Sequence, residues 1–322
     1  MNQTRRGLIK ALAAVLACAS VRNTEGQDGA ERILRSNIDD PGNFRFIYGH
    51  PDLRQAFQRF LTNVFHLYPE DAFDELIGEA AATLDADRDI YAHVQPRLDT
   101  IKPFLGDLTY ALPALSKQKR VLGNQTRELL DTDVRYEGYV EVGSNGRYLD
   151  ALEERLTIVG DVFLVSDEAP TLSPADVLDR GQLFEAGRFL PLRDYETDFA
   201  ASIPAGSVDL VTVYIGFHHC PPDLRQAFFE SLRTIMAPGG TLIVRDHDVD
   251  SDRMWRMVAL AHDVFNMGTN ETWDYNARER RHFYSLAELD AMLTRAGFES
   301  DGRRLFQDGD PTLNALMRYD KV

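Results

Sequence analysis

The 322-residue chain has few cysteines, no long apolar run and a deficit of basic residues. Its two cysteines are Cys18 and Cys220, and no C-x-x-C pair occurs, so neither a disulfide framework nor a cysteine zinc site is expected. No apolar stretch reaches about 18 residues, so we expect no full membrane span. The formal net charge of -16 disfavours a nucleic-acid partner, because such binding depends on lysine and arginine neutralising phosphates.

Apolar residues, by contrast, are plentiful. Hydrophobic residues make up 44% of the chain and aromatic residues 10%, which is enough for a substantial core. A length of 322 residues suits one large domain with an extension. The excess of acidic residues is most simply explained as a charged surface that favours solubility.

Residues 1–23 have the pattern of an export signal. Thr4–Lys10 is basic and contains paired arginines like those of a twin-arginine signal, and the apolar run Ala11–Ala19 follows. Cys18 lies where a lipid anchor would be attached in a lipobox. The pattern predicts an exported protein, either periplasmic or anchored to a membrane. An amphipathic start on a cytoplasmic protein is the alternative.

Residues 24–130 indicate a helical N-terminal extension that precedes the main domain. Residues 24–40 are polar, and we expect them to be loose. Apolar residues then recur at helical spacing, and Pro103 and Pro113 are expected to interrupt the helices. The predicted helices are Pro51–Tyr68, Asp71–Leu84, Asp87–Ile101 and Leu115–Leu130.

The segment Tyr139–Leu149 organises the rest of the chain. A short apolar strand runs into a Gly-Ser-Asn-Gly turn at 143–146, and an amphipathic helix follows. An α/β sheet presents a nucleotide site in this way, at the carboxyl end of its first strand. Gly143 lets the backbone turn and approach a ligand closely, and Glu141 is expected to point into the same crevice. The dinucleotide fingerprint G-x-G-x-x-G is not met, because Asn145 and Leu149 stand where it needs glycine.

Two further strands are predicted downstream of this turn. Val162–Val165 is followed by Asp167, about 20 residues beyond the turn, where such folds hold the two hydroxyls of a ribose. Glu168 competes for this role, and an ordinary surface acid at a strand end is the alternative. A third strand is predicted over Phe189–Leu192, although Pro191 is unfavourable inside a strand.

Residues 207–249 carry the second strong signal. A buried strand ends in Gly-Phe-His-His at 216–219, helix Asp223–Met236 follows, and strand Thr241–Val244 comes after a Pro-Gly-Gly stop. This order resembles motifs IV and V of the class I S-adenosylmethionine-dependent methyltransferases, and the turn at 143–146 resembles their motif I. The runs YIGFHH (214–219) and VRDHDV (244–249) resemble one branch of that family, which has no assigned substrate.

The resemblance covers about residue 121 to the C-terminus and implies a fold. It implies an α/β, Rossmann-like methyltransferase sheet over residues 131–322, mostly parallel, whose last strand, Thr312–Tyr319, is antiparallel. It also implies S-adenosylmethionine as the cofactor. The residues that would bind this cofactor are Glu141, Gly143, Ser144, Asn145, Gly146, Asp167, Asp194, Tyr195, Ile215 and Gly216.

Histidines and aspartates gather where the fourth and fifth strands end. They are His218, His219, Asp246, His247 and Asp248. A cap inserted at about 249–284 would add His262 and enclose the site. We interpret His219 or His247 as a base, oriented by Asp246 or Asp248. The alternatives are a structural turn without a titrating role and a metal site, but adjacent His218 and His219 on an extended chain could face opposite ways.

The sequence therefore predicts a methyltransferase whose acceptor is a small molecule. The predicted cap favours an enclosed acceptor, and the acidity disfavours nucleic acid. Two other functions stay open: a catalytically silent Rossmann-like binding protein, and a metal-dependent enzyme that uses the histidine and aspartate cluster. The oligomeric state does not follow from the sequence.

Overall fold

The computed structural model describes residues 42–130, 133–180 and 187–322. The signal-like segment with Cys18 and the polar stretch 24–40 lie outside the described residues. Within the described part, none of the helices combines the length and the hydrophobicity that crossing a bilayer requires.

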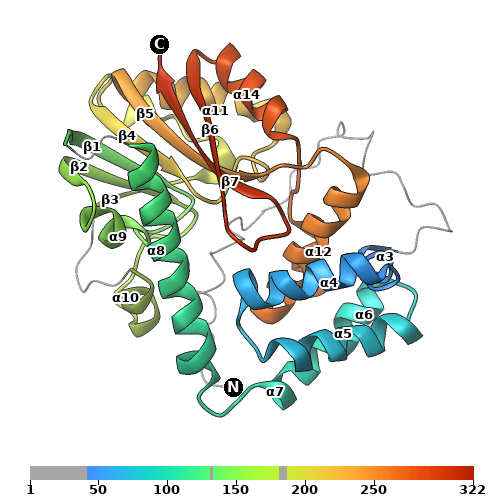
Figure 1. Ribbon diagram of the computed structural model, residues 1–322. Coiled ribbons are helices and arrows are strands. Elements are labelled where there is room, and N and C mark those ends of the chain that lie inside the picture. The colour runs from blue at the N-terminus through green and yellow to red at the C-terminus, as the bar shows by residue number, and fades with distance from the viewer. Residues whose placement is uncertain (1–41, 131–132, 181–186) are drawn as a thin grey trace.

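A seven-stranded sheet forms the centre of the main domain, with strand order β3-β2-β1-β4-β5-β7-β6 (Figure 1). Strands β1 to β5 pair in parallel, and β7 runs antiparallel to both of its neighbours, β5 and β6. The predicted Rossmann-like sheet with an antiparallel last strand is confirmed. The strands are β1 Arg135–Val142, β2 Thr157–Ser166, β3 Arg188–Pro191, β4 Val208–Val213, β5 Met236–His247, β6 Phe298–Phe306 and β7 Asn314–Lys321.

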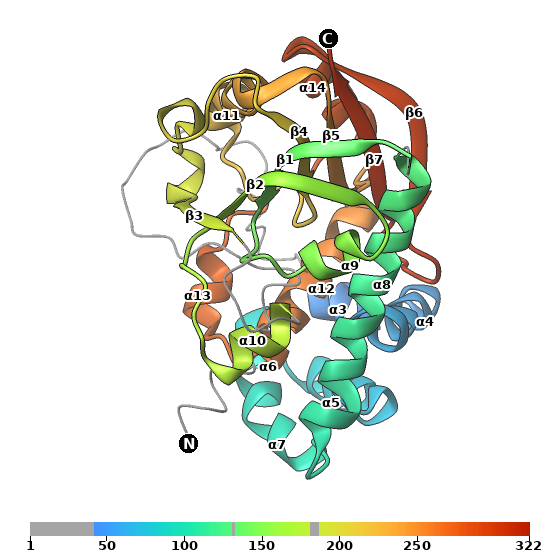
Figure 2. The same ribbon diagram turned by 90° about the vertical axis from the view of Figure 1, so that its left-hand side faces the viewer.

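Side chains alternate between the two faces of the sheet, and helices cover both. Val140 and Val142 pack on one face with side chains of α11 and α14, whereas Tyr139 packs on the other with side chains of α8 and α9. Figure 2 shows these helices around the sheet. The central strand β4 is buried almost throughout, as expected for a parallel strand covered on both faces. Pro191 ends β3 at the sheet edge, where its missing N–H interrupts no ladder. The covering helices are α8 Leu112–Leu129, α9 Leu149–Glu153, α10 Pro174–Arg180, α11 Pro222–Ile235 and α14 Leu286–Arg295.

The N-terminal helices form a second layer that packs against a helix from the far end of the chain. These helices lie beside α12, which follows β5 (Figure 1). Their apolar side chains share one buried cluster with those of α12. The Tyr68 hydroxyl donates to the Gly268 carbonyl at 2.9 Å, and the Tyr91 hydroxyl donates to the Glu271 carbonyl at 2.8 Å. The helices concerned are α3 Gly42–Tyr48, α4 Pro51–Phe60, α5 Glu70–Thr83, α6 Asp87–Val94, α7 Leu98–Ile101, α12 Asp252–Gly268 and α13 Trp273–Arg278.

Three predicted helix boundaries in this layer differ from the structure. The helix from Pro51 continues as a π-helical turn and ends at Phe65, because His66 adopts a left-handed conformation with φ 41°. The helix predicted over Asp87–Ile101 is divided by a 3₁₀ turn that contains a proline, which has no N–H to donate. Pro113 begins α8 rather than interrupting it, since the first turn of a helix tolerates proline.

Candidate active site

The glycine turn after β1 is held close to the loop that follows β4. Gly143 and Gly146 have φ values of 85° and 90°, which side chains with a Cβ rarely adopt. A Cβ on Gly143 would lie 2.1 Å from the Cδ1 of Ile215, so the two loops touch there. The structure therefore brings the two predicted cofactor loops together.

Glu141 is completely buried, and its hydrogen bonds join the turn to the strand before it. Its Oε1 accepts from the Gly146 backbone N–H at 3.1 Å and from the Ser144 hydroxyl, and its Oε2 accepts from the Tyr139 hydroxyl at 3.0 Å. Burial raises the pKa of Glu141, and the bonds from Ser144 and Tyr139 oppose that effect. The sequence predicts this carboxylate in the crevice, whereas the structure places it where it fixes the shape of the turn.

Asp167 follows β2 and offers an acceptor atom that is not satisfied by the protein. Its Oδ2 is buried and has no hydrogen-bond partner among the described residues. Burial, aided by the nearby charges of Asp194 and Glu168, raises the pKa of Asp167 to about 6. Glu168 itself is exposed. Of the two acids at this strand end, Asp167 is therefore the one placed to accept hydrogen bonds from a ligand.

Asp194 and Tyr195 differ in their placement. Asp194 is partly buried, has a left-handed φ of 53° and lies close enough to Asp167 to act on its pKa. Tyr195 is buried in the core, where its ring lies edge-on to Phe228 with centroids 5.1 Å apart. The packing of Tyr195 against the core leaves Asp194 as the more accessible of the two.

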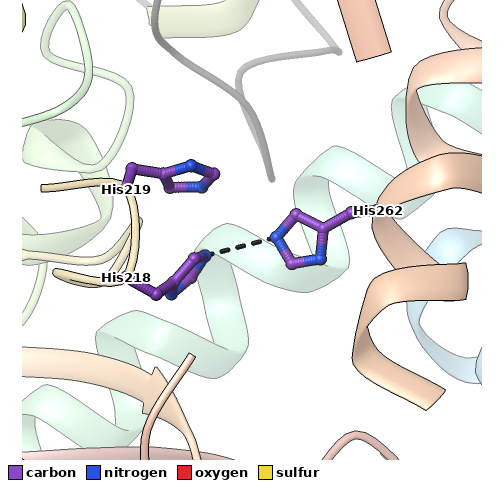
Figure 3. A group of neighbouring side chains, drawn as sticks. All are labelled: His218, His219 and His262. Atoms are coloured by element: carbon purple, nitrogen blue, oxygen red, sulfur yellow. Dashed lines mark hydrogen bonds between the residues drawn. The ribbon is translucent and has the colours of Figure 1, made fainter. Parts of the chain in front are cut away.

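The two adjacent histidines after β4 point into the same space. His218 and His219 lie in a turn, not on an extended chain, and their ring centroids are 4.2 Å apart (Figure 3). The expectation that they could face opposite ways is wrong for this reason. Gly216 makes the turn, with a φ of 79°, and a Cβ there would come within 2.8 Å of both His218 and Asp246.

Asp246 joins the end of β5 to this turn. Its Oδ1 accepts from the Nδ1 of His218 at 2.6 Å, and its Oδ2 accepts from the Phe217 N–H at 2.8 Å and from the Tyr284 hydroxyl. Burial lowers the pKa of His218 well below its usual range, so this imidazole is neutral near pH 7. Asp246 and Asp248 are the two acids predicted to orient a histidine, and Asp246 contacts His218.

Asp248 has a different role at the same strand end. Its Oδ1 accepts from the Leu286 N–H at 2.9 Å, which places it at the start of α14. His247, the neighbouring residue, contacts the Thr312 carbonyl through Nδ1 at 3.0 Å. Since a carbonyl can only accept, Nδ1 carries the proton of neutral His247 and Nε2 has the lone pair. Burial lowers the pKa of His247 to about 4.

His262 reaches the cluster from α12. Its Nε2 lies 3.2 Å from the Nε2 of His218, and its Nδ1 contacts the Val258 carbonyl at 2.9 Å (Figure 3). The Nδ1 of His219 contacts the Arg280 carbonyl at 3.1 Å. His218, His219, His247 and His262 are each at most 3% exposed. The structure thus gathers four predicted site histidines from three elements into one buried cluster.

An ionic network that the sequence does not reveal borders the cluster. Arg281 donates to Asp263 and to Glu279, each at 2.7 Å. The Oε1 of Glu279 is buried without a hydrogen-bond partner among the described residues and lies 3.9 Å from the Nδ1 of His219. Asp263 follows the candidate His262 directly in the sequence, whereas Glu279 and Arg281 belong to the charged run 278–281, where no sequence signal distinguishes them from an ordinary solvated face.

Comparison with known proteins identifies the class of enzyme. Residues 116–301, more than half of the chain, match the family model described as "Methyltransferase domain". The chain belongs to this family. It is a class I S-adenosylmethionine-dependent methyltransferase, as the resemblance of its motifs implied. A search of curated proteins gave no match.

Solved structures with a similar fold include several methyltransferases of low sequence identity. One is the Burkholderia thailandensis 1,6-didemethyltoxoflavin-N1-methyltransferase with bound S-adenosylhomocysteine, at 15% identity and a TM-score of 0.42, covering 74% of this chain and 91% of that one. The mitomycin 7-O-methyltransferase MmcR has 16% identity and a TM-score of 0.44, covering 79% and 68%. The CurJ carbon methyltransferase has 16% identity and a TM-score of 0.45, covering 84% and 71%.

The residues at the carboxyl edge of the sheet fit S-adenosylmethionine, the cofactor of the class. The backbone turns at Gly143 and Gly146 with positive φ, and the side chain of Ile215 packs directly against Gly143. The unsatisfied Oδ2 of Asp167 suits a ribose hydroxyl, which needs an acceptor. Ile215 and Gly216 form the neighbouring wall, and Asn145 is partly exposed at the tip of the turn.

Proposed function

We propose that the protein transfers a methyl group to a small-molecule acceptor that binds at the ends of β4 and β5, under a cap made by residues 249–284. The observation that carries this proposal is the buried histidine cluster directly beside the glycine turn. Gly143 touches Ile215, and Gly216, the next residue, touches His218 and Asp246. The cofactor loops and the histidines are therefore neighbours along one edge of the sheet.

The cap assignment rests on contacts between the insertion and the histidine turn. His262 on α12 faces His218, the Arg280 carbonyl contacts His219, and the His282 N–H donates to the His218 carbonyl at 2.8 Å. Because the cluster is almost completely buried, an acceptor can reach it only when the cap moves. Such closure would exclude water from the reaction.

The protein has to contribute little to the chemical step itself. S-adenosylmethionine supplies an activated methyl group, so the main task of the chain is to align the acceptor. His247 would bind the acceptor's polar hydrogen through its Nε2, since its Nδ1 proton is held by the Thr312 carbonyl. The Asn314 amide nitrogen, now 3.4 Å from this Nε2, would give way to the acceptor. A pKa of about 4 keeps His247 neutral at physiological pH, but it also makes this imidazole a weak base. The site therefore suits an acceptor that loses its proton readily.

The test combines calorimetric titration with a turnover screen. We expect the full chain to bind S-adenosylhomocysteine and to methylate at least one member of a panel of small phenols, thiols and heterocyclic amines. His247→Gln should keep the binding and lose the turnover, and His50→Gln, at an exposed histidine, should keep both. Binding without turnover of any panel member would favour the silent binding protein. Unchanged turnover in His247→Gln would exclude the role given to that residue.

A further inference from the structure

The three histidines of Figure 3 have the geometry of ligands to one metal ion. His218 and His219 come from the turn after β4 and His262 comes from α12, and their rings converge on one space. One nitrogen of each lies within 4.8 Å of the others. Two imidazoles on a tetrahedral zinc ion, at about 2.05 Å each, have nitrogens about 3.3 Å apart. The Nε2 atoms of His218 and His262 are 3.2 Å apart, so that pair needs almost no adjustment.

In His218 and His262 the protons lie on the outer nitrogens, so the two Nε2 atoms that face each other are both free to bind a cation. The Nδ1 of His218 faces Asp246 and the Nδ1 of His262 faces the Val258 carbonyl, and both partners are acceptors. Each neutral ring therefore carries its proton on Nδ1 and a lone pair on Nε2. Two lone pairs then face each other across 3.2 Å in a buried site. A cation bound by both nitrogens would remove the repulsion between these lone pairs.

The surroundings of the three rings match those of metal-bound histidines. Such histidines usually donate their other N–H to a carboxylate or a backbone carbonyl, which fixes the ring and its tautomer. His218 has Asp246, His262 has Val258 and His219 has Arg280 in this position. Asp246 is itself held by Phe217 and Tyr284. The structure therefore already contains the hydrogen-bonding partners that metal-bound histidines require.

The carboxylate of Glu279 lies beside the ring of His219. Glu279 is 1% exposed at its side chain, and its Oε1 has no hydrogen-bond partner among the described residues. It lies 3.9 Å from the Nδ1 of His219. An acceptor at Nδ1, like the Arg280 carbonyl, favours the tautomer of His219 that carries its proton on Nδ1, which leaves Nε2 as the nitrogen that would bind a metal.

We propose that His218, His219 and His262 bind a zinc ion. Neutral imidazoles suit zinc, and three protein ligands leave one tetrahedral position open, as in catalytic zinc sites. If the proposed function also holds, that position would receive the acceptor's oxygen, nitrogen or sulfur and lower its pKa. This would compensate for the weak basicity of the buried histidines. The zinc site itself stands on its own geometry and does not depend on the acceptor.

The test uses the full chain, stripped of metal with a chelator and then titrated with Zn²⁺. We expect one zinc ion per chain by elemental analysis, a dissociation constant below about 1 µM, and a higher unfolding temperature with zinc. Co²⁺ in its place should give the visible absorption of a tetrahedral ion. No zinc above the level of a blank, with no change in unfolding temperature, would overturn the proposal.

Matched variants separate the site from accidental binding by other histidines. His262→Gln and His219→Gln should each lose zinc, whereas His50→Gln, at an exposed histidine, should keep it. Asp246→Asn should weaken zinc binding by about 10–100-fold, as expected when a metal-bound histidine loses its hydrogen-bonding partner. Equal zinc binding in all four variants would overturn the proposal. S-adenosylhomocysteine titration of each variant reports folding and the cofactor site, so failure of the zinc site is distinguishable from failure of the methyltransferase function.

Discussion

Replacing Asp167 with asparagine should weaken cofactor binding while making the free protein more stable. The change keeps the shape of the side chain and removes its charge. In the free protein that charge is unfavourable, because burial and the neighbouring Asp194 raise the pKa of Asp167 to about 6. In the complex the same charge would be favourable, because the unsatisfied Oδ2 would accept from a ribose hydroxyl.

The two opposing effects can be given rough sizes. A hydrogen bond to a charged acceptor contributes about 1.5–3 kcal/mol net, which corresponds to a loss of affinity of about 10–150-fold. An ordinary aspartate has a pKa of about 3.9, and a tenfold change in proton affinity corresponds to about 1.4 kcal/mol. Allowing for the partial exposure of Asp167, we expect Asp167→Asn to raise the free energy of unfolding at pH 7 by about 1–2 kcal/mol.

The sign of the pH dependence follows from the same raised pKa. The folded state binds a proton at Asp167 more readily than the unfolded state, so the destabilisation develops as pH rises through about 4 to 6. On the proposed assignment, the ribose hydroxyl binds to the ionised carboxylate of Asp167. The affinity of the wild-type protein for S-adenosylhomocysteine should therefore fall as pH drops below about 6, and that of Asp167→Asn should not.

Calorimetric titration with S-adenosylhomocysteine and urea unfolding measure both effects. Glu168→Gln is the matched control, since it removes a neighbouring but exposed acid and should leave the affinity within about twofold. If Asp167→Asn binds like the wild type, or if Glu168→Gln loses the affinity instead, the assignment of the ribose acceptor is wrong. A fall in stability of Asp167→Asn would contradict the account of its raised pKa.

Four further substitutions test the packing of the protein by urea unfolding. Gly216→Ala should cost about 3 kcal/mol or more, because it adds a close contact to a strained φ, whereas Gly239→Ala, with a φ of 74° and no atom within 4 Å, should cost about 1–2 kcal/mol. Equal losses of unfolding free energy in Gly216→Ala and Gly239→Ala would show that the positive φ, and not the close contact, sets the cost. Ser285→Ala removes the capping box of α14 and should cost about 1 kcal/mol without changing S-adenosylhomocysteine affinity. Phe265→Ala should cost about 3–5 kcal/mol by opening a cavity where α12 meets Phe65, and a smaller loss would mean that this contact is loose.

The sheet could be predicted from the sequence because each of its signals is local. Glycines that need a positive φ, such as Gly143 and Gly216, mark the loops, and apolar runs between them mark buried strands. Even the unfavourable Pro191 proved consistent, because its strand lies at the sheet edge. Helix ends were less accurate, since they depend on single conformations such as the left-handed His66.

The details of the site could not be predicted, because they depend on contacts between distant residues. Whether His218 and His219 face the same way is decided by the turn at Gly216, which is packed against Asp246 from the next strand. Periodicity also cannot show that the ring of Tyr195 belongs to the core. His262 was found as a candidate, but its approach to His218 across 44 residues comes from the docking of α12.

The packing of the N-terminal helices on α12 has a consequence for synthesis of the protein. Tyr68 and its partner Gly268 are 200 residues apart in the chain. At about 5–20 residues per second, the ribosome would finish the first helices about 10–40 s before α12 emerges. During that time the apolar surface that later covers α12 has no native partner and is open to chaperones or to aggregation. The rate at which translation reaches α12 should therefore influence the yield of correctly folded enzyme.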